Sequence, residues 1–315
     1  MPSFNPQSDI PDLSERVCIV TGGNSGLGEA TVTALAQHNP GTLYLAARSR
    51  ARAELALERI KETSAAARSV NIVILELDLA SIDSVKEAAE RVNREASRVD
   101  ILYLNGGVAA MPAAKTKDGF EVHFGTNYIG HVLLTQLLMP KLLETAALPG
   151  ADVRVVSISS TMHKSFAPRE GIIFENLHTA MGEIGGSARY AQSMLAKNLF
   201  ARELARRYPQ IMSLAVHPGG VKSSAYNGSK DMNWLGHKLL LVVIALMGVS
   251  PEEGAKGQLW CSFSKDTSNG TYYEPVGKTG KESSLSRDDE LASKLWNWTD
   301  EELRKHGAPA WPSQS

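Results

Sequence analysis

Apolar and polar segments alternate along this chain in the manner of strand–helix repeats. Short apolar runs predict strands, and longer segments with apolar residues three or four positions apart predict the helices between them. Because helices separate successive strands, the pattern is typical of a parallel sheet built from βαβ units. The predicted strands cover residues 16–21, 42–47, 71–77, 100–104, 153–158, 211–216 and 270–274.

The predicted helices fill the intervals between these strands. The first follows a glycine-rich loop and extends to about Gln37, and others cover residues 128–143, 189–208 and 254–260. In the segment 189–208 the helical period places Leu195, Leu199 and Leu204 toward the core. The alternation breaks only in residues 224–250, which we interpret as a substrate-covering insertion.

The chain of 315 residues has no internal repeat and no low-complexity linker. A parallel α/β sheet often reaches this length without dividing, so we expect one domain over residues 1–315. Its core is expected at about residues 16–277, followed by a C-terminal tail at about 278–315.

The charge balance argues against polyanionic partners. The 33 basic and 34 acidic residues nearly cancel, which offers no electrostatic attraction to nucleic acid or anionic membranes. The most apolar stretch, residues 239–249, is shorter than the roughly 20 residues that a spanning helix needs. We favour a lid or core helix there over an interfacial membrane anchor, and expect no transmembrane segment.

The cysteines and the N-terminus bear on the compartment. Cys18 and Cys261 are the only cysteines, and they are not in metal-ligand spacing. Cys18 lies in an apolar strand, where a buried reduced thiol is expected. Residues 1–15 lack the basic and apolar regions of a secretory signal. We therefore expect a reducing, cytoplasmic location and no metal site.

A glycine-rich loop follows the first predicted strand and leads directly into a helix. Glycines allow the backbone to turn tightly and to approach a pyrophosphate, while the helix N-terminus offers free N–H groups to its charge. This context of strand, loop and helix predicts a dinucleotide site. Its expected contacts are Gly22, Ser25, Gly26, Leu27 and Gly28.

The spacing Thr-Gly-x-x-x-Gly-x-Gly of residues 21–28 resembles that of classical short-chain dehydrogenases/reductases. Segments such as Gly270–Gly277 and Leu295–Thr299 are similar to fungal relatives of retinol dehydrogenases and WW-domain oxidoreductases, so the resemblance covers about residues 17–303. It implies a single Rossmann-type, doubly wound parallel sheet, a nicotinamide dinucleotide and oxidoreductase activity.

The end of the second strand indicates which dinucleotide is bound. NAD sites place a carboxylate there for the free ribose 2′-hydroxyl, whereas this chain has Arg48, whose guanidinium suits a 2′-phosphate. The alternative is that Arg48 merely begins the next helix in solvent. We expect NADP(H). The resemblance also implies cofactor contacts at Asp78, Asn105, Gly219, Val221 and Ser223.

The family tetrad of Asn, Ser, Tyr and Lys is matched at three positions. The resemblance implies Asn127 in a proton relay, Ser160 as the group that polarises a carbonyl, and Tyr190 as acid/base and cofactor contact. A tyrosine serves near neutral pH only when nearby positive charge lowers its pKa from about 10. Ser160 is preferred over Ser159 by strand alternation and family register.

The fourth position departs from the family pattern, because the expected lysine is Met194. Methionine carries no charge and donates no hydrogen bond to a ribose. Lys197 shares a helix face with Tyr190 and lies about 4.5 Å beyond Met194 along the axis. Lys197 either reaches back toward the ribose or is an ordinary solvated or ion-paired residue.

These observations lead to one main hypothesis and two alternatives. The main one is an NADP(H)-dependent carbonyl reductase or alcohol dehydrogenase acting on an apolar small molecule, with Met194 at the lysine position. A second is an NADP(H)-binding protein without redox activity, such as a sensor, scaffold or non-redox catalyst. A third is that Met194 is a substitution introduced into a competent enzyme. A homo-oligomer is left open.

Overall fold

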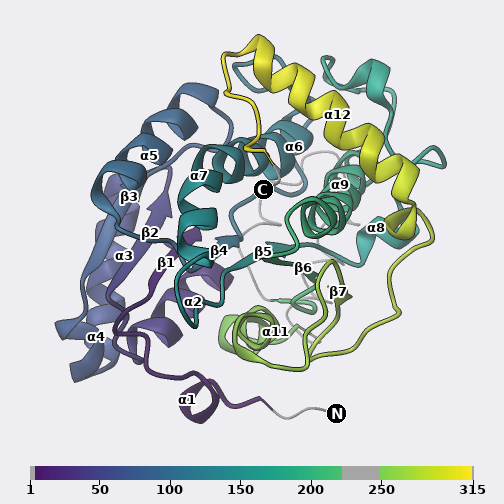
Figure 1. Cartoon of the computed structure of the whole chain (residues 1–315). Helices are drawn as coiled ribbons and strands as arrows, with labels where there is room; N and C mark the ends of the chain where they lie inside the picture. Colours follow the sequence, from purple (N-terminus) through teal and green to yellow (C-terminus); the bar gives the residue numbers. More distant parts are fainter. Residues whose placement is uncertain (1–3, 222–247, 314–315) are drawn as a thin grey trace.

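A seven-stranded sheet forms the centre of the protein (Figure 1). The computed structural model describes residues 4–221 and 248–313. The strand order is β3-β2-β1-β4-β5-β6-β7, and every neighbouring pair is parallel, which confirms the predicted fold class. The strands are β1 Val17–Thr21, β2 Thr42–Ala47, β3 Ile72–Glu76, β4 Ile101–Leu104, β5 Arg154–Ile158, β6 Met212–Val216 and β7 Tyr272–Tyr273. Each lies within its predicted segment, and only the last is much shorter than expected.

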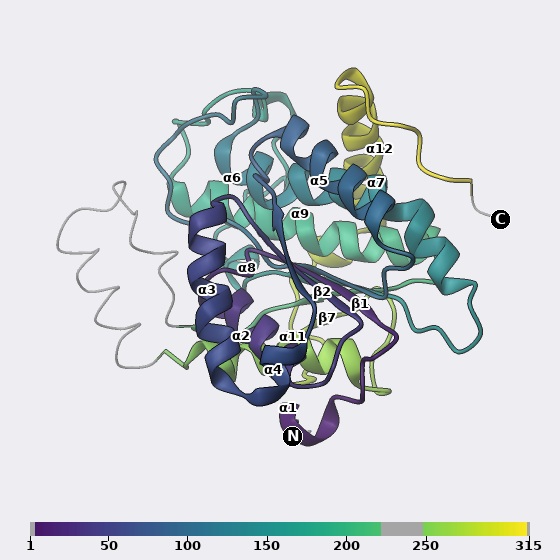
Figure 2. The same cartoon turned by 90° about the vertical axis from the view of Figure 1, so that its left-hand side faces the viewer.

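Helices cover both faces of this sheet (Figure 2). Side chains alternate along each strand, so that Ile19 of β1 packs in one core while Cys18 and Val20 pack in the other. One layer contains α5 Ile82–Glu95, α7 Gly130–Ala146 and α9 Gly186–Arg207. The opposite layer contains α2 Gly26–Ala36, α3 Arg50–Thr63 and α11 Pro251–Phe263.

The described residues also form several short helical elements. They are α1 Pro6–Asp9, α4 Ala65–Ser69, α6 Val122–Phe124, the π-helix η1 Gly125–Ile129, α8 Met162–Ser165, and the 3-10 helices η2 Phe174–Asn176 and η4 Leu285–Arg287. The helix predicted over residues 128–143 is therefore α7 preceded by a π-helical turn. Leu195, Leu199 and Leu204 of α9 are fully buried, as the helical period predicted.

The segment predicted as a C-terminal tail contains a packed helix. Helix α12, Asp289–Lys305, lies against α9 (Figure 1). Trp296 of α12 stacks on Phe200 of α9 with ring centroids 5.8 Å apart, and Trp311 packs 4.3 Å from Trp296. The segment expected as a C-terminal tail thus contains helix α12, which packs on α9.

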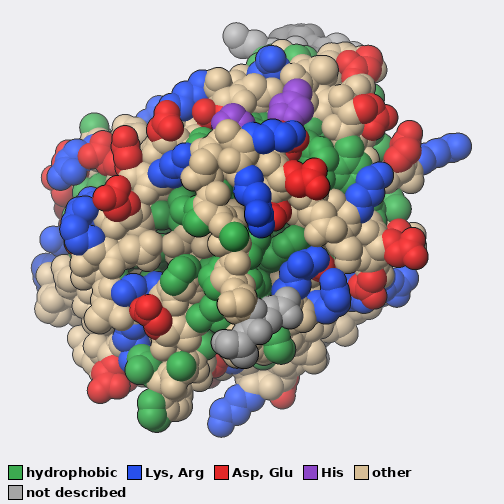
Figure 3. Space-filling view, turned by 45° about the horizontal axis from the view of Figure 1, so that its top comes forward, with side chains coloured by type: hydrophobic (Ala, Val, Ile, Leu, Met, Phe, Trp, Pro, Cys, Tyr) green, Lys and Arg blue, Asp and Glu red, His purple; other side chains and the backbone are tan. Residues whose placement is uncertain are grey.

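Four further expectations concern the surface charge, the two cysteines, membrane-spanning helices and the predicted insertion. Basic and acidic side chains intermingle over the face in Figure 3. Cys18 and Cys261 are free and buried. In the described parts of the chain, no helix is long and apolar enough to cross a membrane. The insertion predicted at 224–250 lies outside the described residues except for its last three positions.

The topology places a crevice beside β1. Strand β1 pairs with β2 on one side and with β4 on the other, so successive connections leave the sheet in opposite directions there. The chain after β1 continues into the helical layer on one face of the sheet and the chain after β4 into the layer on the other face, and ligands of open α/β sheets bind at such a point.

Candidate active site

The loop after β1 depends on glycines for its shape. Gly22 and Gly26 have φ angles of +66° and +52°, in the left-handed region that other residues adopt at a cost. A Cβ on Gly28 would lie 2.2 Å from the carbonyl oxygen of Gly22, and a Cβ on Gly22 would lie 2.8 Å from the Cα of Gly106. The backbones after β1 and β4 therefore approach each other as closely as they do only because these positions lack side chains.

Thr21 joins these two loops at the end of β1. Its hydroxyl oxygen accepts hydrogen bonds from the backbone N–H groups of Asn105 (2.9 Å) and Gly106 (2.8 Å). The Asn105 side-chain amide donates to the Thr21 carbonyl at 2.8 Å. This leaves the Asn105 Oδ1 buried and without a partner among the described residues. An unpaired buried acceptor beside a glycine loop indicates a place for a ligand donor group.

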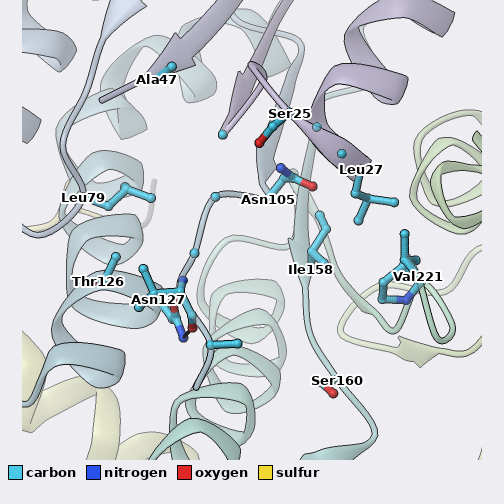
Figure 4. Close-up of a pocket in the computed structure, with 18 of the residues that line it drawn as sticks. Ser25, Leu27, Ala47, Leu79, Asn105, Thr126, Asn127, Ile158, Ser160 and Val221 are labelled. Atoms are coloured by element: carbon cyan, nitrogen blue, oxygen red, sulfur yellow. Dashed lines mark hydrogen bonds between the residues drawn. The ribbon is translucent and has the colours of Figure 1, made fainter. Parts of the chain in front are cut away.

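A pocket of about 630 Å³ extends from this loop across the carboxyl ends of the strands. Figure 4 shows its labelled residues, with Ala47 and Ser25 toward one end and Ser160 toward the other. Of the residues predicted to bind a cofactor, all but one line this single pocket: Gly22, Ser25, Gly26, Leu27, Gly28, Arg48, Asp78, Asn105, Tyr190, Gly219 and Val221. The exception, Ser223, lies outside the described residues.

The end of the pocket beside β2 is basic. Arg48 and Arg52 both line it and are exposed, whereas the guanidinium of Arg50 is engaged by Glu54 and Glu76. Arg52 was missed in the sequence. The arginines at positions 48, 50 and 52 indicated a basic segment after the second strand. Only the conformation of the first turn of α3 determines which of them line the pocket.

The opposite end of the pocket contains the predicted acid/base residues. Ser160 follows β5, Tyr190 lies in the first turns of α9, and both line the pocket. Ser159 lines it too, but its hydroxyl donates to the Met194 carbonyl at 3.2 Å. The Ser160 oxygen accepts from the backbone N–H of Met162 at 3.3 Å, which leaves its own hydrogen for a substrate oxygen. The choice of Ser160 stays a prediction.

Asn127 acts on the loop that follows β4. Its side-chain oxygen accepts from the Val108 N–H (2.8 Å), and its amide donates to the Val108 carbonyl (2.9 Å) and to the Ser193 hydroxyl (3.0 Å). It belongs to the π-helical turn η1, a form that often marks functional sites. Its own carbonyl accepts from His131 Nδ1 at 2.8 Å. Asn127 thus links α9, η1 and the pocket wall.

A buried ionic cluster lies behind Tyr190. The adjacent Arg189 is 1% exposed, and its Nε lies 3.5 Å from a carboxylate oxygen of the fully buried Glu121. Glu121 also contacts His123 Nδ1 at 2.8 Å, and the His123 ring meets the Tyr190 ring edge-on, with centroids 6.1 Å apart. These contacts hold the start of α9, and with it Tyr190, against the α6 region.

Met194 and Lys197 both line the pocket from α9. Met194 is 4% exposed and brings an apolar side chain to the position where a charge was expected. Lys197 is 2% exposed, and its Nζ donates to the Leu104 carbonyl at 2.7 Å and lies 3.5 Å from His131 Nδ1. Across the described residues no carboxylate is paired with it. The alternative of a solvated Lys197 is therefore wrong, and no ion pair of Lys197 is present among the described residues.

Burial dominates the ionisation of this region. Removal from water disfavours a charged amine, and it lowers the pKa of Lys197 from 10.5 to about 7. Burial, and then the neighbouring Lys197, hold the pKa of His131 well below its usual value. Burial also lowers the pKa of His217, another pocket residue, to about 4. Both imidazoles are therefore neutral at pH 7. In the described residues, no group of three or more His, Cys, Asp or Glu could hold a metal ion.

Comparisons with known proteins agree with this architecture. The sequence profile of the short chain dehydrogenase family matches residues 16–170. The short-chain dehydrogenase/reductase drtF of Aspergillus calidoustus is 34% identical over 94% of this chain and 96% of its own. Retinol dehydrogenase 11 of Mus musculus is 35% identical over 90% of this chain and 85% of its own.

Solved structures give the same result. An uncharacterized protein from Mycobacterium Paratuberculosis superposes with a TM-score of 0.73 at 27% identity, over 98% of this chain and 100% of its own. NADPH-bound carbonyl reductase from chicken fatty liver gives a TM-score of 0.60 at 25% identity, over 86% of this chain and 99% of its own. The sheet order, the glycine loop and the full-length relatives together show that this chain belongs to the classical short-chain dehydrogenase/reductase family of oxidoreductases.

Proposed function

We propose that the protein is an NADP(H)-dependent oxidoreductase that interconverts an apolar carbonyl compound and its alcohol. The observation that carries this proposal is a single pocket. The glycine-rich loop after β1 lines one end of it together with Arg48 and Arg52, and Ser160 and Tyr190 line the other end. Relatives named retinol dehydrogenase support an apolar substrate. The buried, free thiols of Cys18 and Cys261 support a reducing compartment such as the cytoplasm.

The residues present fit a dinucleotide. Gly22 and Gly28 let the loop backbone pack this tightly, because a Cβ at either position would collide with backbone atoms, and the N-terminus of α2 offers N–H groups to the charge of a pyrophosphate. The unpaired Asn105 Oδ1 can accept from a ribose hydroxyl. Asp78 lines the pocket after β3, on the side expected for the adenine ring.

The preference for a 2′-phosphate follows from the charges beside β2. Arg48, Ser49 and Arg52 all line the pocket here. None of these side chains carries a negative charge that would repel a phosphate. A guanidinium binds phosphate with paired, charge-assisted hydrogen bonds. Arg48 is therefore proposed as the main reader of the 2′-phosphate, with Arg52 as its partner.

The proposed chemistry divides between cofactor and protein. Bound NADPH would supply the hydride. Ser160 donates a hydrogen bond to the carbonyl oxygen, and Tyr190 gives that oxygen a proton as it becomes a hydroxyl. Asn127 holds the loop after β4, so that the floor of the pocket stays in place. In the reverse direction Tyr190 accepts the proton.

Met194 favours a second candidate, in which the pocket binds NADP(H) without redox chemistry. Its thioether supplies no positive charge that would stabilise a tyrosinate at Tyr190. The two candidates differ in turnover and agree on binding.

One experiment separates them. The purified chain is mixed with NADPH and a panel of apolar aldehydes and ketones, and the loss of reduced-nicotinamide absorbance is followed. We expect turnover that falls by roughly a hundredfold or more in Tyr190→Phe and Ser160→Ala. Ser159→Ala is the matched control for the strand register, with a much smaller loss. Tight NADPH binding without turnover, in this chain and in Met194→Lys, would refute the oxidoreductase and support the binding protein.

A further inference from the structure

Lys197 is a buried amine that has no carboxylate partner among the described residues. Lysine is almost never fully buried unless it is paired, because removing an ammonium from water is costly. In the part of the chain that the structure describes, the polar groups within hydrogen-bonding distance of Nζ are the Leu104 carbonyl at the end of β4 and the His131 ring from α7. Along the described chain, His131 is the one titratable group within hydrogen-bonding distance of Nζ, and no carboxylate is paired with it. A cost of this kind is typical of functional sites.

The contacts leave the amino group with unused hydrogen-bonding capacity. An ammonium has three N–H donors, and the Leu104 carbonyl takes one of them. His131 cannot take a second through Nδ1, because that nitrogen donates its own hydrogen to the Asn127 carbonyl, which can only accept. Among the described residues, none accepts a hydrogen bond from the remaining donors of Lys197. Lys197 lines the pocket, so acceptors for these donors can come from a ligand there.

His131 is fixed as a neutral spacer. Its Nε2 lies 2.9 Å from the Thr21 hydroxyl, and its Nδ1 lies 2.8 Å from the Asn127 carbonyl oxygen. With both ring nitrogens engaged and the ring fully buried, it lies beside Nζ as a rigid neighbour and adds no charge.

The location of Nζ indicates which part of a ligand it faces. Leu104 is the last residue of β4, and Asn105, Gly106 and Gly107 directly after it form the wall of the pocket. Helical side chains lean toward the N-terminus of their helix, so Lys197 leans toward the turn that carries Met194 and Tyr190. Nζ thus lies on the Tyr190 side of the pocket, away from Arg48.

We propose that Lys197 takes over the task that Met194 cannot perform: anchored on the Leu104 carbonyl and positioned by His131, its ammonium donates hydrogen bonds to the ribose hydroxyls next to the nicotinamide. The inference rests on the proposed function for the identity of the cofactor. It assigns the cation of this site to a residue one helical turn beyond position 194, and it makes Lys197 a cofactor-binding residue and His131 a positioning residue.

The test compares two ligands by calorimetry. NADPH spans the whole pocket, whereas 2′,5′-ADP contains only the adenosine half and its phosphates. Lys197→Met should bind NADPH at least about tenfold more weakly than the unchanged chain does, because charge-assisted hydrogen bonds are lost, while its affinity for 2′,5′-ADP should stay the same. The double variant Lys197→Met/Met194→Lys should recover most of the affinity for NADPH. Lys117→Met, on the surface and paired with Asp83, is the control.

Several outcomes would overturn the inference. Unchanged NADPH affinity in Lys197→Met would show that the ammonium does not touch the cofactor. Equal weakening of NADPH and 2′,5′-ADP would show a structural role, and Lys197→Gln repeats the comparison with an uncharged side chain that can donate hydrogen bonds. A chain that binds NADPH but reduces no carbonyl would refute the proposed oxidoreductase, and the ligand comparison would still decide the role of Lys197.

Discussion

The burial of Lys197 makes a prediction about stability that needs no substrate. Burial lowers its pKa from 10.5 to about 7, and the unfolded chain restores the ordinary value. A difference of this size corresponds to roughly 5 kcal/mol at about 1.4 kcal/mol per pH unit. Below pH 7 both states hold the proton and the folded protein bears the full cost of burying it. Above pH 10.5 both states are neutral and the cost disappears.

Replacing Lys197 with methionine should therefore change stability in a pH-dependent way. At pH 6 the variant avoids the cost of burying the ammonium, roughly 5 kcal/mol, but the Leu104 carbonyl loses its donor, which costs about 1–3 kcal/mol. The variant should therefore be the more stable protein at this pH. As the pH rises from 7 to 9.5 the unfolded chain binds more protons than the folded one, so the advantage should shrink by about 1.4 kcal/mol per unit. Toward pH 10 the lost hydrogen bond should leave the variant the less stable protein.

The assay is urea denaturation of both chains at a series of pH values, followed by the fluorescence of the buried Trp260 and Trp296. Lys117→Met, which replaces an exposed lysine, should show a difference from the unchanged chain that does not vary with pH. If the difference for Lys197→Met is likewise constant from pH 6 to 9.5, Lys197 titrates normally in the folded protein and the reasoning from burial fails.

Three further predictions concern the dinucleotide. Arg48→Ala should erase most of a roughly tenfold preference for NADPH over NADH in calorimetry, while Arg50→Ala, whose guanidinium is held by two glutamates, should keep it. Gly28→Ala should abolish binding because its Cβ would lie 2.2 Å from a carbonyl oxygen of the same loop, whereas Gly185→Ala, with nothing within 4 Å, should bind normally. NADPH affinity should fall as the pH rises from 7 to 9, because the Lys197 ammonium deprotonates; a flat curve for the unchanged chain would contradict this.

The sequence alone determined those features that depend on local physics. A strand buried on both faces reads as a continuous apolar run, so β1 to β6 could be located within one or two residues. The loop from Gly22 to Gly28 could be predicted because a tight turn beside a helix N-terminus needs residues without a Cβ. Arg48 could be predicted as a cofactor contact because it directly follows the second strand along the chain, where dinucleotide sites contact the adenosine ribose.

The tertiary structure alone determined that Lys197 is buried and which groups surround its amino group. Helix α9 packs against the sheet on one side and against α12 on another, so helical period could not tell which polar position meets water. The environment of Nζ comes from Leu104 and His131, which are 93 and 66 residues away in sequence. Electrostatic cost depends on which groups surround a charge in space, and those groups were brought together only by the packing of β4, α7 and α9.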